Sequence, residues 1–432
     1  MKCHYACQSA EHVLERRKFL GTLAGVAGAA TFGGMSGAPS MVRAAMPELT
    51  AGNKHIIMVW LAGGVSQLET WDPKPKTDTG GPFRAIPTSV PGMHISELLP
   101  HTAKQMHHLA IVRSVNTKEN DHGKGAYCMT TGRKQEPVAT YPHLGAVGAK
   151  LLAPENSPLP GHIHVAAGGS GGSANDAAFL GPRYASIVLG DGNPPRNTAL
   201  PEGVTPAADD KRYAFRAKVN DHFARRRRSA ESDAFLSSFD QARQLMERRD
   251  VFDVSKESTA DQERYGKSEF GKQCLLARRL IEKGVSCVQV SHSNYDTHYE
   301  NFDFHIEQLG ELDRPFATLV ADLVDRGLWE STLVVVMSEF GRTPTINHLM
   351  GRDHWGMAWS VALGGCGIQP GAIIGKTNAN GTEVADREVD HGHLFHTYLK
   401  AVGVDSTAKF DAAGRSIPMA DPAAAPITEL LT

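Results

Sequence analysis

The hydrophobic pattern changes its period twice between residues 285 and 359. A β-branched run over 285–290 predicts one strand, and an apolar run over 333–337 suits a strand buried on both faces. Between them, apolar residues recur at intervals of three and four, which is the pattern of one face of a helix. Strand, helix and strand in this order predict a βαβ unit of a parallel sheet.

Other apolar runs extend the predicted sheet on both sides of this unit. The run Ile56–Leu61 enters a Gly-rich turn and is the candidate first strand, and shorter runs at 109–112 and 360–363 are also strand-like. From 206 to 283 the chain becomes helical and highly charged, which predicts an inserted helical excursion or cap over the sheet. The pattern therefore predicts an α/β fold with a mostly parallel central sheet.

Polar residues follow the strands of the βαβ unit. Asp296 and His298 come directly after the first strand, Glu339 follows the second, and Asp353 and His354 lie in the next loop. Because ligands of parallel α/β sheets bind outside the carboxyl ends of the strands, these loops should converge. Imidazole and carboxylate are common ligands of zinc and similar metals. The alternative is a structural one, in which an Asp only holds a His tautomer inside a polar loop.

The first 44 residues predict a twin-arginine export signal. The pair Arg16-Arg17 precedes a Gly/Ala-rich apolar run over 21–34, and Val42-Arg43-Ala44 suits a cleavage site. The apolar run is shorter than the ~20 residues that a transmembrane helix needs. We therefore expect a periplasmic or extracellular mature chain over 45–432, with no stable membrane span.

Charge and cysteine content narrow the classes of partner. Removal of residues 1–44 takes away five Lys/Arg and two Asp/Glu, so the mature chain has 40 basic and 45 acidic residues, a net charge of −5. Such a chain shows no sign of binding nucleic acid or an anionic membrane. Its four remaining cysteines, at 128, 274, 287 and 366, form no CxxC motif, and we expect buried free thiols.

Several motifs together resemble known families. Asp-x-His at 296–298, a helix carrying Asp313, a strand ending Ser-Glu-Phe-Gly and then Gly-Arg-Asp-His are similar to the alkaline phosphatase and sulfatase superfamily. More closely, GGVSQLETWDPKP, YGKSEFGKQCLLARRLIEKGV, SEFGRTP and GRDHW resemble the exported bacterial family called domain of unknown function 1501, over nearly the whole mature chain. The resemblance implies an alkaline-phosphatase-like three-layer sandwich over 45–432, and the activity of the family is unassigned.

The superfamily pattern also implies a set of metal ligands. Asp296, His298 and His354 match the Asp, His and His of its first metal site, although Asp-x-His is a tighter spacing than the usual one. Glu339 stands at the place of a strand-end Asp, which makes it a fourth candidate. The resemblance implies a divalent metal, with zinc expected and calcium or manganese as alternatives.

Two positions depart from the superfamily pattern. Phe340 replaces a His or Asn ligand and cannot bind a metal. The acidic ligand after the first strand has no direct counterpart, and Asp72 and Glu69 are the nearest acids. Asp72 is our metal-ligand candidate, but Asp72-Pro73 equally suits the start of a turn.

The catalytic candidates are His122 and Arg342. Thr-Gly-Arg at 131–133 resembles a sulfatase motif that lies about ten residues after the nucleophile, and counting back places His122 where a hydroxyl or thiol is usual. Imidazole can act as nucleophile, general acid/base or ligand, or His122 simply begins a helix beside Asp121. Arg342 is predicted to clamp an anionic oxygen bidentately, with Arg133 and Arg352 as further candidates.

Two functions fit these residues. The first is an exported metal-dependent hydrolase of phosphate or sulfate esters, acting on a small molecule or a glycan. The second is a non-catalytic binding module on the same fold, for example for anionic glycans. The missing nucleophile favours the second function, whereas the density of His, Asp and Arg in the predicted crevice favours the first.

Overall fold

The computed structural model of the protein describes residues 54–432, apart from 138, 167–174, 191, 228–229 and 413, and apart from the side chains at 224–233. The predicted export signal over 1–44 lies outside the described residues.

Among the described residues, eight strands form the central sheet, in the order β12-β4-β11-β8-β1-β7-β5-β6. These strands are β1 (His55–Leu61), β4 (Leu109–Val115), β5 (His162–Ala166), β6 (Ile187–Leu189), β7 (Cys287–His292), β8 (Thr332–Met337), β11 (Trp359–Gly365) and β12 (Ile373–Ile374). Strand β11 is antiparallel to β4 and β8, whereas the other neighbours pair in parallel. The predicted mostly parallel sheet is confirmed.

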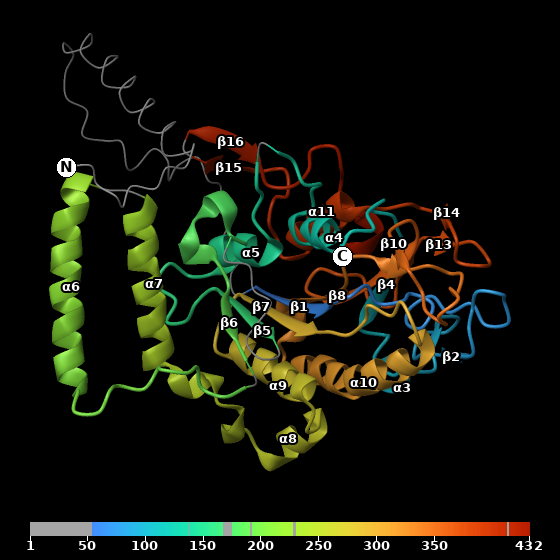
Figure 1. Ribbon diagram of the computed structural model, residues 1–432, viewed down its shortest axis with the longest axis horizontal. Coiled ribbons are helices and arrows are strands. Elements are labelled where there is room, and N and C mark those ends of the chain that lie inside the picture. Colours follow the sequence, from blue (N-terminus) through green and yellow to red (C-terminus); the bar gives the residue numbers. More distant parts are fainter. Residues whose placement is uncertain (1–53, 138, 167–174, 191, 228–229, 413) are drawn as a thin grey trace, which may run out of the picture. The chain divides into compact units, whose positions relative to one another are not determined.

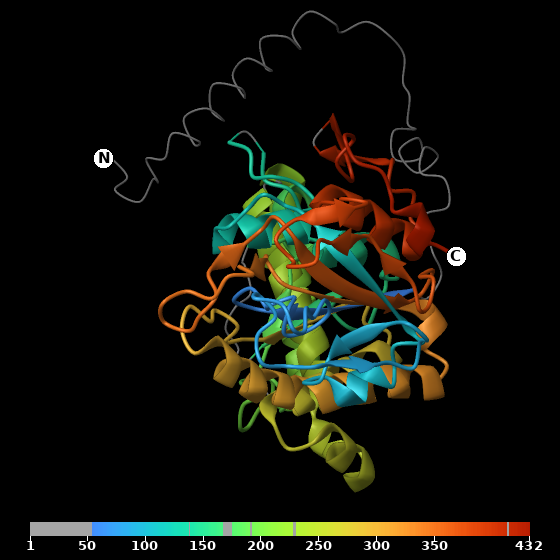
Figure 2. The same cartoon turned by 90° about the vertical axis from the view of Figure 1, so that its right-hand side faces the viewer.

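Successive residues of the central strand β1 face opposite layers, as the two-residue period of a strand requires. Ile57 and Val59 belong to a core shared with helices α9 (Glu269–Glu282) and α10 (Asn301–Asp325). Ile56 and Met58 belong to a second core, shared with α4 (His122–Thr131), α5 (Leu144–Leu152) and α11 (His391–Ala401). Figures 1 and 2 show these two helix layers on opposite faces of the sheet, so the predicted three-layer architecture is confirmed.

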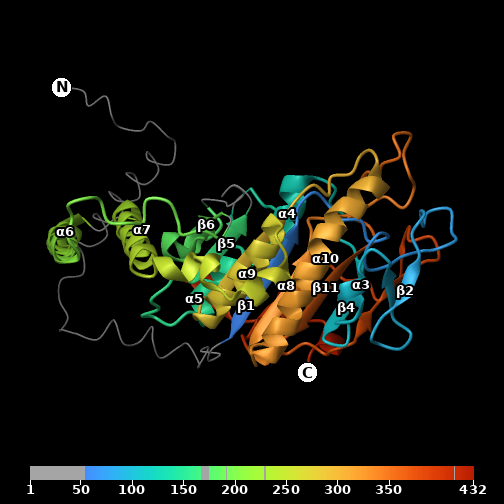
Figure 3. The same ribbon diagram turned by 90° about the horizontal axis from the view of Figure 1, so that it is seen from below.

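The segment predicted as a helical excursion over 206–283 contains two kinds of helix. Helices α6 (Pro206–Arg227) and α7 (Ala230–Glu247) stand beside the β6 edge of the sheet (Figures 1 and 3). Helix α7 is attached by hydrogen bonds from the side chains of Gln241 and Gln244 to backbone oxygens of Arg183 and Ser157. Helix α9, by contrast, is buried core. The α6–α7 pair therefore lies beside the β6 strand at the edge of the sheet and does not cover a face of the sheet as a cap would.

The remaining elements are short. They are α3 (Pro100–Ala103), α8 (Thr259–Tyr265), the strand pairs β2 (Ala85–Pro87) with β3 (His94–Ser96), β9 (Gly341–Arg342) with β10 (His354–Trp355), β13 (Lys376–Thr377) with β14 (Val384–Asp386), β15 (Lys409–Ala412) with β16 (Arg415–Pro418), and several 3-10 turns. Cys128, Cys274, Cys287 and Cys366 are buried free thiols, as predicted. Of the helices in the described residues, none is both long enough and apolar enough to cross a bilayer.

Candidate metal centre

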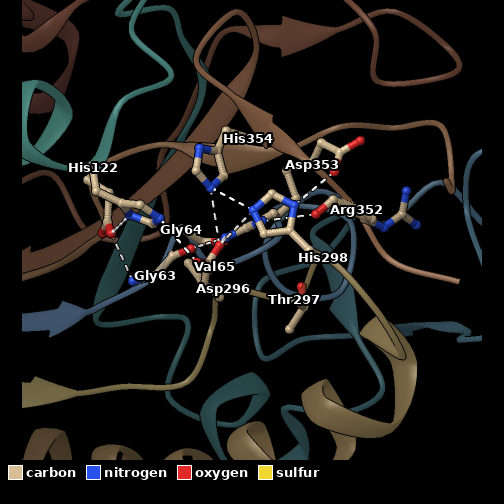
Figure 4. Close-up of polar contacts among 12 residues, drawn as sticks. Gly63, Gly64, Val65, His122, Asp296, Thr297, His298, Arg352, Asp353 and His354 are labelled. Carbon is tan, nitrogen blue, oxygen red and sulfur yellow. Dashed lines mark hydrogen bonds and ion pairs between the residues drawn. The ribbon is translucent and has the colours of Figure 1, made fainter. Parts of the chain in front are cut away.

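The strands β1, β4, β7 and β8 finish at the same end of the sheet, here called the carboxyl edge, and the loops that follow them meet there. Asp296 and His298 come from the loop after β7, Glu339 follows β8, and His122 begins helix α4 after β4. His354 comes from β10, which pairs with β9 so that His354 lies opposite Arg342. Since β11 is antiparallel, its preceding loop reaches this same edge. Figure 4 shows the side chains of Asp296, His122, His298 and His354 facing one another.

Three ligand atoms converge at the centre of this group. The Nε2 atoms of His298 and His354 are 3.0 Å apart, and they lie 3.2 and 3.1 Å from Oδ1 of Asp296. The other ring nitrogens are engaged elsewhere. Nδ1 of His298 is 2.8 Å from a carboxylate oxygen of Asp353, and Nδ1 of His354 is 2.7 Å from the backbone oxygen of Asn120.

These outer contacts fix the ring tautomers. A carbonyl or carboxylate oxygen only accepts, so Nδ1 of each imidazole carries the hydrogen and each neutral ring turns an Nε2 lone pair inward. Oδ1 of Asp296 accepts a hydrogen bond from Arg342, and the two Nε2 lone pairs beside it face one another with no hydrogen between them, an arrangement that a cation would satisfy. Two ligands at about 2.0–2.1 Å from tetrahedral zinc are about 3.3 Å apart, close to the separations found here. The donor set and its outer partners therefore fit a divalent metal ion.

His122 faces the same point from the opposite side. Its Nδ1 lies 2.7 Å from Oε1 of Glu339, and its Nε2 lies 3.3 Å from Oδ2 of Asp296. One ligand atom each from His122, Asp296 and His354 can be chosen so that all lie within 4.8 Å of one another. The ring of Phe340 packs against those of His122 and His354, with centroid distances of 4.9 and 4.4 Å. Phe340 thus supports the imidazoles, although it cannot bind a metal.

The charges of the site alter the ionisation of two groups. The hydrogen bond with Glu339 raises the pKa of His122, and this effect exceeds the opposing effect of burial. For Asp296, burial favours the neutral acid, but Arg342, His354 and His122 outweigh it and lower the carboxyl pKa to about 2. Asp296 is therefore an anion at neutral pH, as a metal ligand must be.

A family model described as "Protein of unknown function (DUF1501)" matches residues 53–431. The chain belongs to the DUF1501 family. No curated protein matches its sequence.

Solved structures similar to this DUF1501 protein are remote. A sulfatase from Pseudoalteromonas sp. has a TM-score of 0.39 and 11% identity, with 81% of this chain and 68% of that chain covered. A phosphonate monoester hydrolase from Silicibacter pomeroyi has a TM-score of 0.39 and 10% identity, with 84% and 75% covered. A lipoteichoic acid synthase from Listeria monocytogenes has a TM-score of 0.36 and 9% identity, with 87% and 77% covered. Residue roles in the DUF1501 protein therefore rest on its own geometry.

Arg342 does not form the anion clamp that was predicted from the sequence of this DUF1501 protein. Its guanidinium is buried and donates hydrogen bonds to the backbone oxygens of Gly63, Gly64 and Arg352 and to the carboxylate of Asp296. With these hydrogens bound to the protein itself, Arg342 holds Asp296 in place and is not available to grip a substrate.

The other arginine candidates also have internal partners. Arg352 forms a fully buried ion pair with Glu69 at 2.8 Å. Arg133 donates to the backbone oxygens of Pro418 and Ala420. The expected supporting clamp is therefore not formed by either side chain.

Asp72 is not brought to the candidate metal centre. Its carboxylate is buried, lies 3.0 Å from Nζ of Lys74 and accepts a hydrogen bond from Thr377. At the end of β1, the group that reaches the site is instead a backbone one, because the N–H of Gly63 donates to Glu339 at 2.8 Å. Asp313 is likewise elsewhere and caps α3 by accepting the N–H groups of His101 and Thr102.

The roles of Asp353 and Asn120 were missed from the sequence. An Asp that holds a His tautomer was an alternative from the sequence, but the pattern did not indicate that Asp353 would be that residue or that it would orient His298, 55 positions away. The contact of Asn120 uses a backbone oxygen, which has no signature in the sequence. Both contacts depend on loops that are distant along the chain.

Proposed function

We propose that this protein is an exported, divalent-metal-dependent hydrolase of phosphate or sulfate esters. The observation that supports the proposal is the convergence of Asp296 Oδ1, His298 Nε2 and His354 Nε2, with both Nδ1 atoms tied to outer acceptors. These three residues would hold the ion, and imidazole ligands favour zinc over calcium or magnesium. When bound, the ion would polarise an ester oxygen and offset the charge that develops on it.

His122 is the proposed general base. Glu339 accepts the hydrogen of Nδ1, which leaves the Nε2 lone pair directed into the site, and its negative charge stabilises the imidazolium that forms. Glu339 is itself held by the N–H of Gly63 and the hydroxyl of Ser338. The water oxygen would bond to phosphorus or sulfur while its proton passes to His122 Nε2. The bond to the alcohol oxygen would break, and the alcohol would leave after taking up a proton from solvent. This step needs no hydroxyl or thiol nucleophile.

The proposed location follows from the sequence of the N-terminal segment. A twin-arginine signal over 1–44 would deliver the mature chain to the periplasm or the outside of the cell, and the proposed substrate there is a small-molecule or glycan ester.

The test measures metal and turnover together. Purified mature protein is expected to hold close to one zinc ion per chain and to hydrolyse at least one member of a panel of 4-nitrophenyl phosphate, diester and sulfate substrates. The variant His354→Ala should lose the metal, whereas His348→Ala, an exposed histidine of the same loop, should keep it. Unchanged metal content in His354→Ala would refute the site.

The absence of a hydroxyl or thiol at the position of His122 favours the second function, a non-catalytic binding module for anionic glycans. That function predicts a bound metal with no turnover on any ester of the panel.

A further inference from the structure

Charged side chains around the metal centre carry an excess of negative charge. Asp296, Glu339 and Asp353 are acidic, and Arg342 is the basic partner among them. Three negative charges and one positive charge leave two negative charges, which a divalent cation brings to zero. The buried Arg352 adds nothing, since Glu69 neutralises it.

The helix α4 side of the site does not change this balance. Lys118 is followed by Glu119, and Lys124 lies three residues after Asp121, so the two lysines and two acids of this segment cancel in the charge count. On the other side, Glu300 adds a further acid. A metal-loaded centre in the described part of the chain is therefore close to neutral, and its one nearby guanidinium already has protein acceptors. With His122 neutral, as its proposed role as general base requires, a second negative charge on a ligand has no counter-ion among these residues.

Three exposed apolar residues, here called the apolar rim, lie on the two loops that carry the candidate ligands His298 and His354. Tyr299, Leu349 and Met350 are 53%, 52% and 57% exposed. Tyr299 directly follows the ligand His298, and Met350 lies four residues before His354. Exposed apolar side chains gathered beside a polar site commonly mark a binding surface.

Backbone contacts hold these rim residues in place. The loops join through an isolated bridge between Tyr299 and Met350, and the N–H groups of Glu300 and Asn301 donate to the oxygens of Leu349 and Met350 at 3.2 and 3.0 Å. The apolar rim is therefore fixed to the same two loops that position the ligands.

From these two observations we infer that the centre takes singly charged esters with an apolar alcohol part, in preference to doubly charged phosphate monoesters. The inference rests on the proposed function and names its substrate class. Aryl or alkyl phosphodiesters and sulfate esters of apolar alcohols share this chemistry, namely one negative charge on a tetrahedral centre and an apolar group for the rim.

The test is a binding series with unreactive probes on the zinc-loaded protein, measured by isothermal titration calorimetry above the second ionisation of phosphonate. The probes are benzenesulfonate, methanesulfonate, methyl phenylphosphonate and phenylphosphonate. The two singly charged aryl probes are expected to bind at least about tenfold more tightly than methanesulfonate and than doubly charged phenylphosphonate. Tightest binding of phenylphosphonate, or equal binding of the two sulfonates, would overturn the inference. A difference between benzenesulfonate and methyl phenylphosphonate separates sulfur from phosphorus esters.

Two kinds of variant test the assigned residues. Tyr299→Ser and Met350→Ser should each weaken benzenesulfonate binding several-fold, whereas Ile306→Ser, a comparably exposed apolar residue on α10, should not. Asp353→Asn retains an oxygen that accepts from His298 and removes one negative charge. It should therefore reduce the difference in affinity between methyl phenylphosphonate and phenylphosphonate. If Ile306→Ser and Tyr299→Ser weakened benzenesulfonate binding equally, the apolar rim would be excluded as the binding surface for the apolar group.

The outcomes also separate this inference from the proposed function. A protein that ranks the probes as expected but hydrolyses no ester keeps the inference and refutes the hydrolase. A protein that hydrolyses 4-nitrophenyl phosphate faster than the corresponding singly charged diester keeps the hydrolase and refutes the inference.

Discussion

His122 illustrates how a single side chain can be ambiguous between two roles. Its Nε2 faces Asp296 at 3.3 Å, a position from which it could either bind a metal ion or accept a proton. Its Nδ1 contact with Glu339 is compatible with both roles, since each needs a fixed tautomer. Removal of the side chain therefore separates the two roles.

The variant His122→Gln distinguishes these roles. As a general base, His122 can be removed without loss of the ion, so we expect unchanged zinc content and a kcat/KM lowered by about 10²–10⁴. Zinc is measured by mass spectrometry and turnover with the best substrate of the panel. Loss of zinc in this variant would instead identify His122 as a ligand.

A second group of histidines lies away from the metal centre. His162 and His164 lie two residues apart on β5 and are both buried, with His162 Nδ1 3.7 Å from a carboxylate oxygen of Asp176. Burial is the main cause that lowers the pKa of each to about 4; Asp176 opposes the shift, and neighbouring His143 acts in the same direction as burial. Both imidazoles are therefore neutral in the folded protein at neutral pH.

This burial predicts acid sensitivity. The unfolded chain has histidine pKa values near 6.5, so between pH 6.5 and 4 the unfolded state binds more protons and stability falls as the pH falls. Each histidine contributes a slope of up to about 1.4 kcal/mol per pH unit. Urea denaturation of the metal-free protein should show this loss, and His164→Gln should flatten it. His222→Gln, which changes an exposed histidine of α6, should leave the slope as it was.

The loops of the site form one structural unit because their backbones are in contact. A side chain at Gly351 would place its Cβ 1.9 Å from the backbone oxygen of His298, and one at Gly63 would place it 2.5 Å from the backbone nitrogen of Asp296. Glycine at these two positions lets neighbouring loops approach closely. That approach, more than any single side chain, sets the separation of the ligand atoms.

The variant Gly351→Ala tests this dependence on loop contact. Because neither backbone can yield easily, we expect weaker zinc binding and a loss of more than about 1 kcal/mol in the free energy of unfolding. Gly310→Ala is the matched control, since no atom lies within 4 Å of its added Cβ in α10. That control should be neutral or stabilising by about 0.5–1 kcal/mol. A Gly351→Ala protein with wild-type zinc affinity would contradict the argument.

The whole molecule supplies the site by aligning parallel strands. His122 and His354 are separated by more than half of the chain, yet their ring centroids are 4.4 Å apart, because β4 and β8 end at the edge where β11 begins. Helices on both faces bury the sheet and keep this edge fixed. A metal that binds only the assembled edge therefore also stabilises the fold.

Zinc should accordingly raise the thermal stability of the protein. Free zinc at about 100 times its Kd adds about 2.7 kcal/mol when it binds the folded state alone. Differential scanning fluorimetry should show an increase in Tm that excess chelator reverses and that His298→Ala abolishes, while His348→Ala retains it. An unchanged Tm in the presence of zinc would exclude a site that depends on the assembled sheet edge.

The sequence by itself determined the periodic elements, the mostly parallel sheet and the set of residues at its strand ends, because side-chain period and strand-end position are local properties. Tertiary structure alone decided which polar side chains were left with an atom that could bind a metal ion or a substrate. Arg342 donates to Asp296 and to backbone oxygens, Arg352 pairs with Glu69, and Arg133 donates to the backbone oxygens of Pro418 and Ala420. Asp72 is held by Lys74 and Thr377, and Asp353 orients His298. Burial forces polar groups to find partners wherever the fold supplies them, and most of these partners lie far away along the sequence.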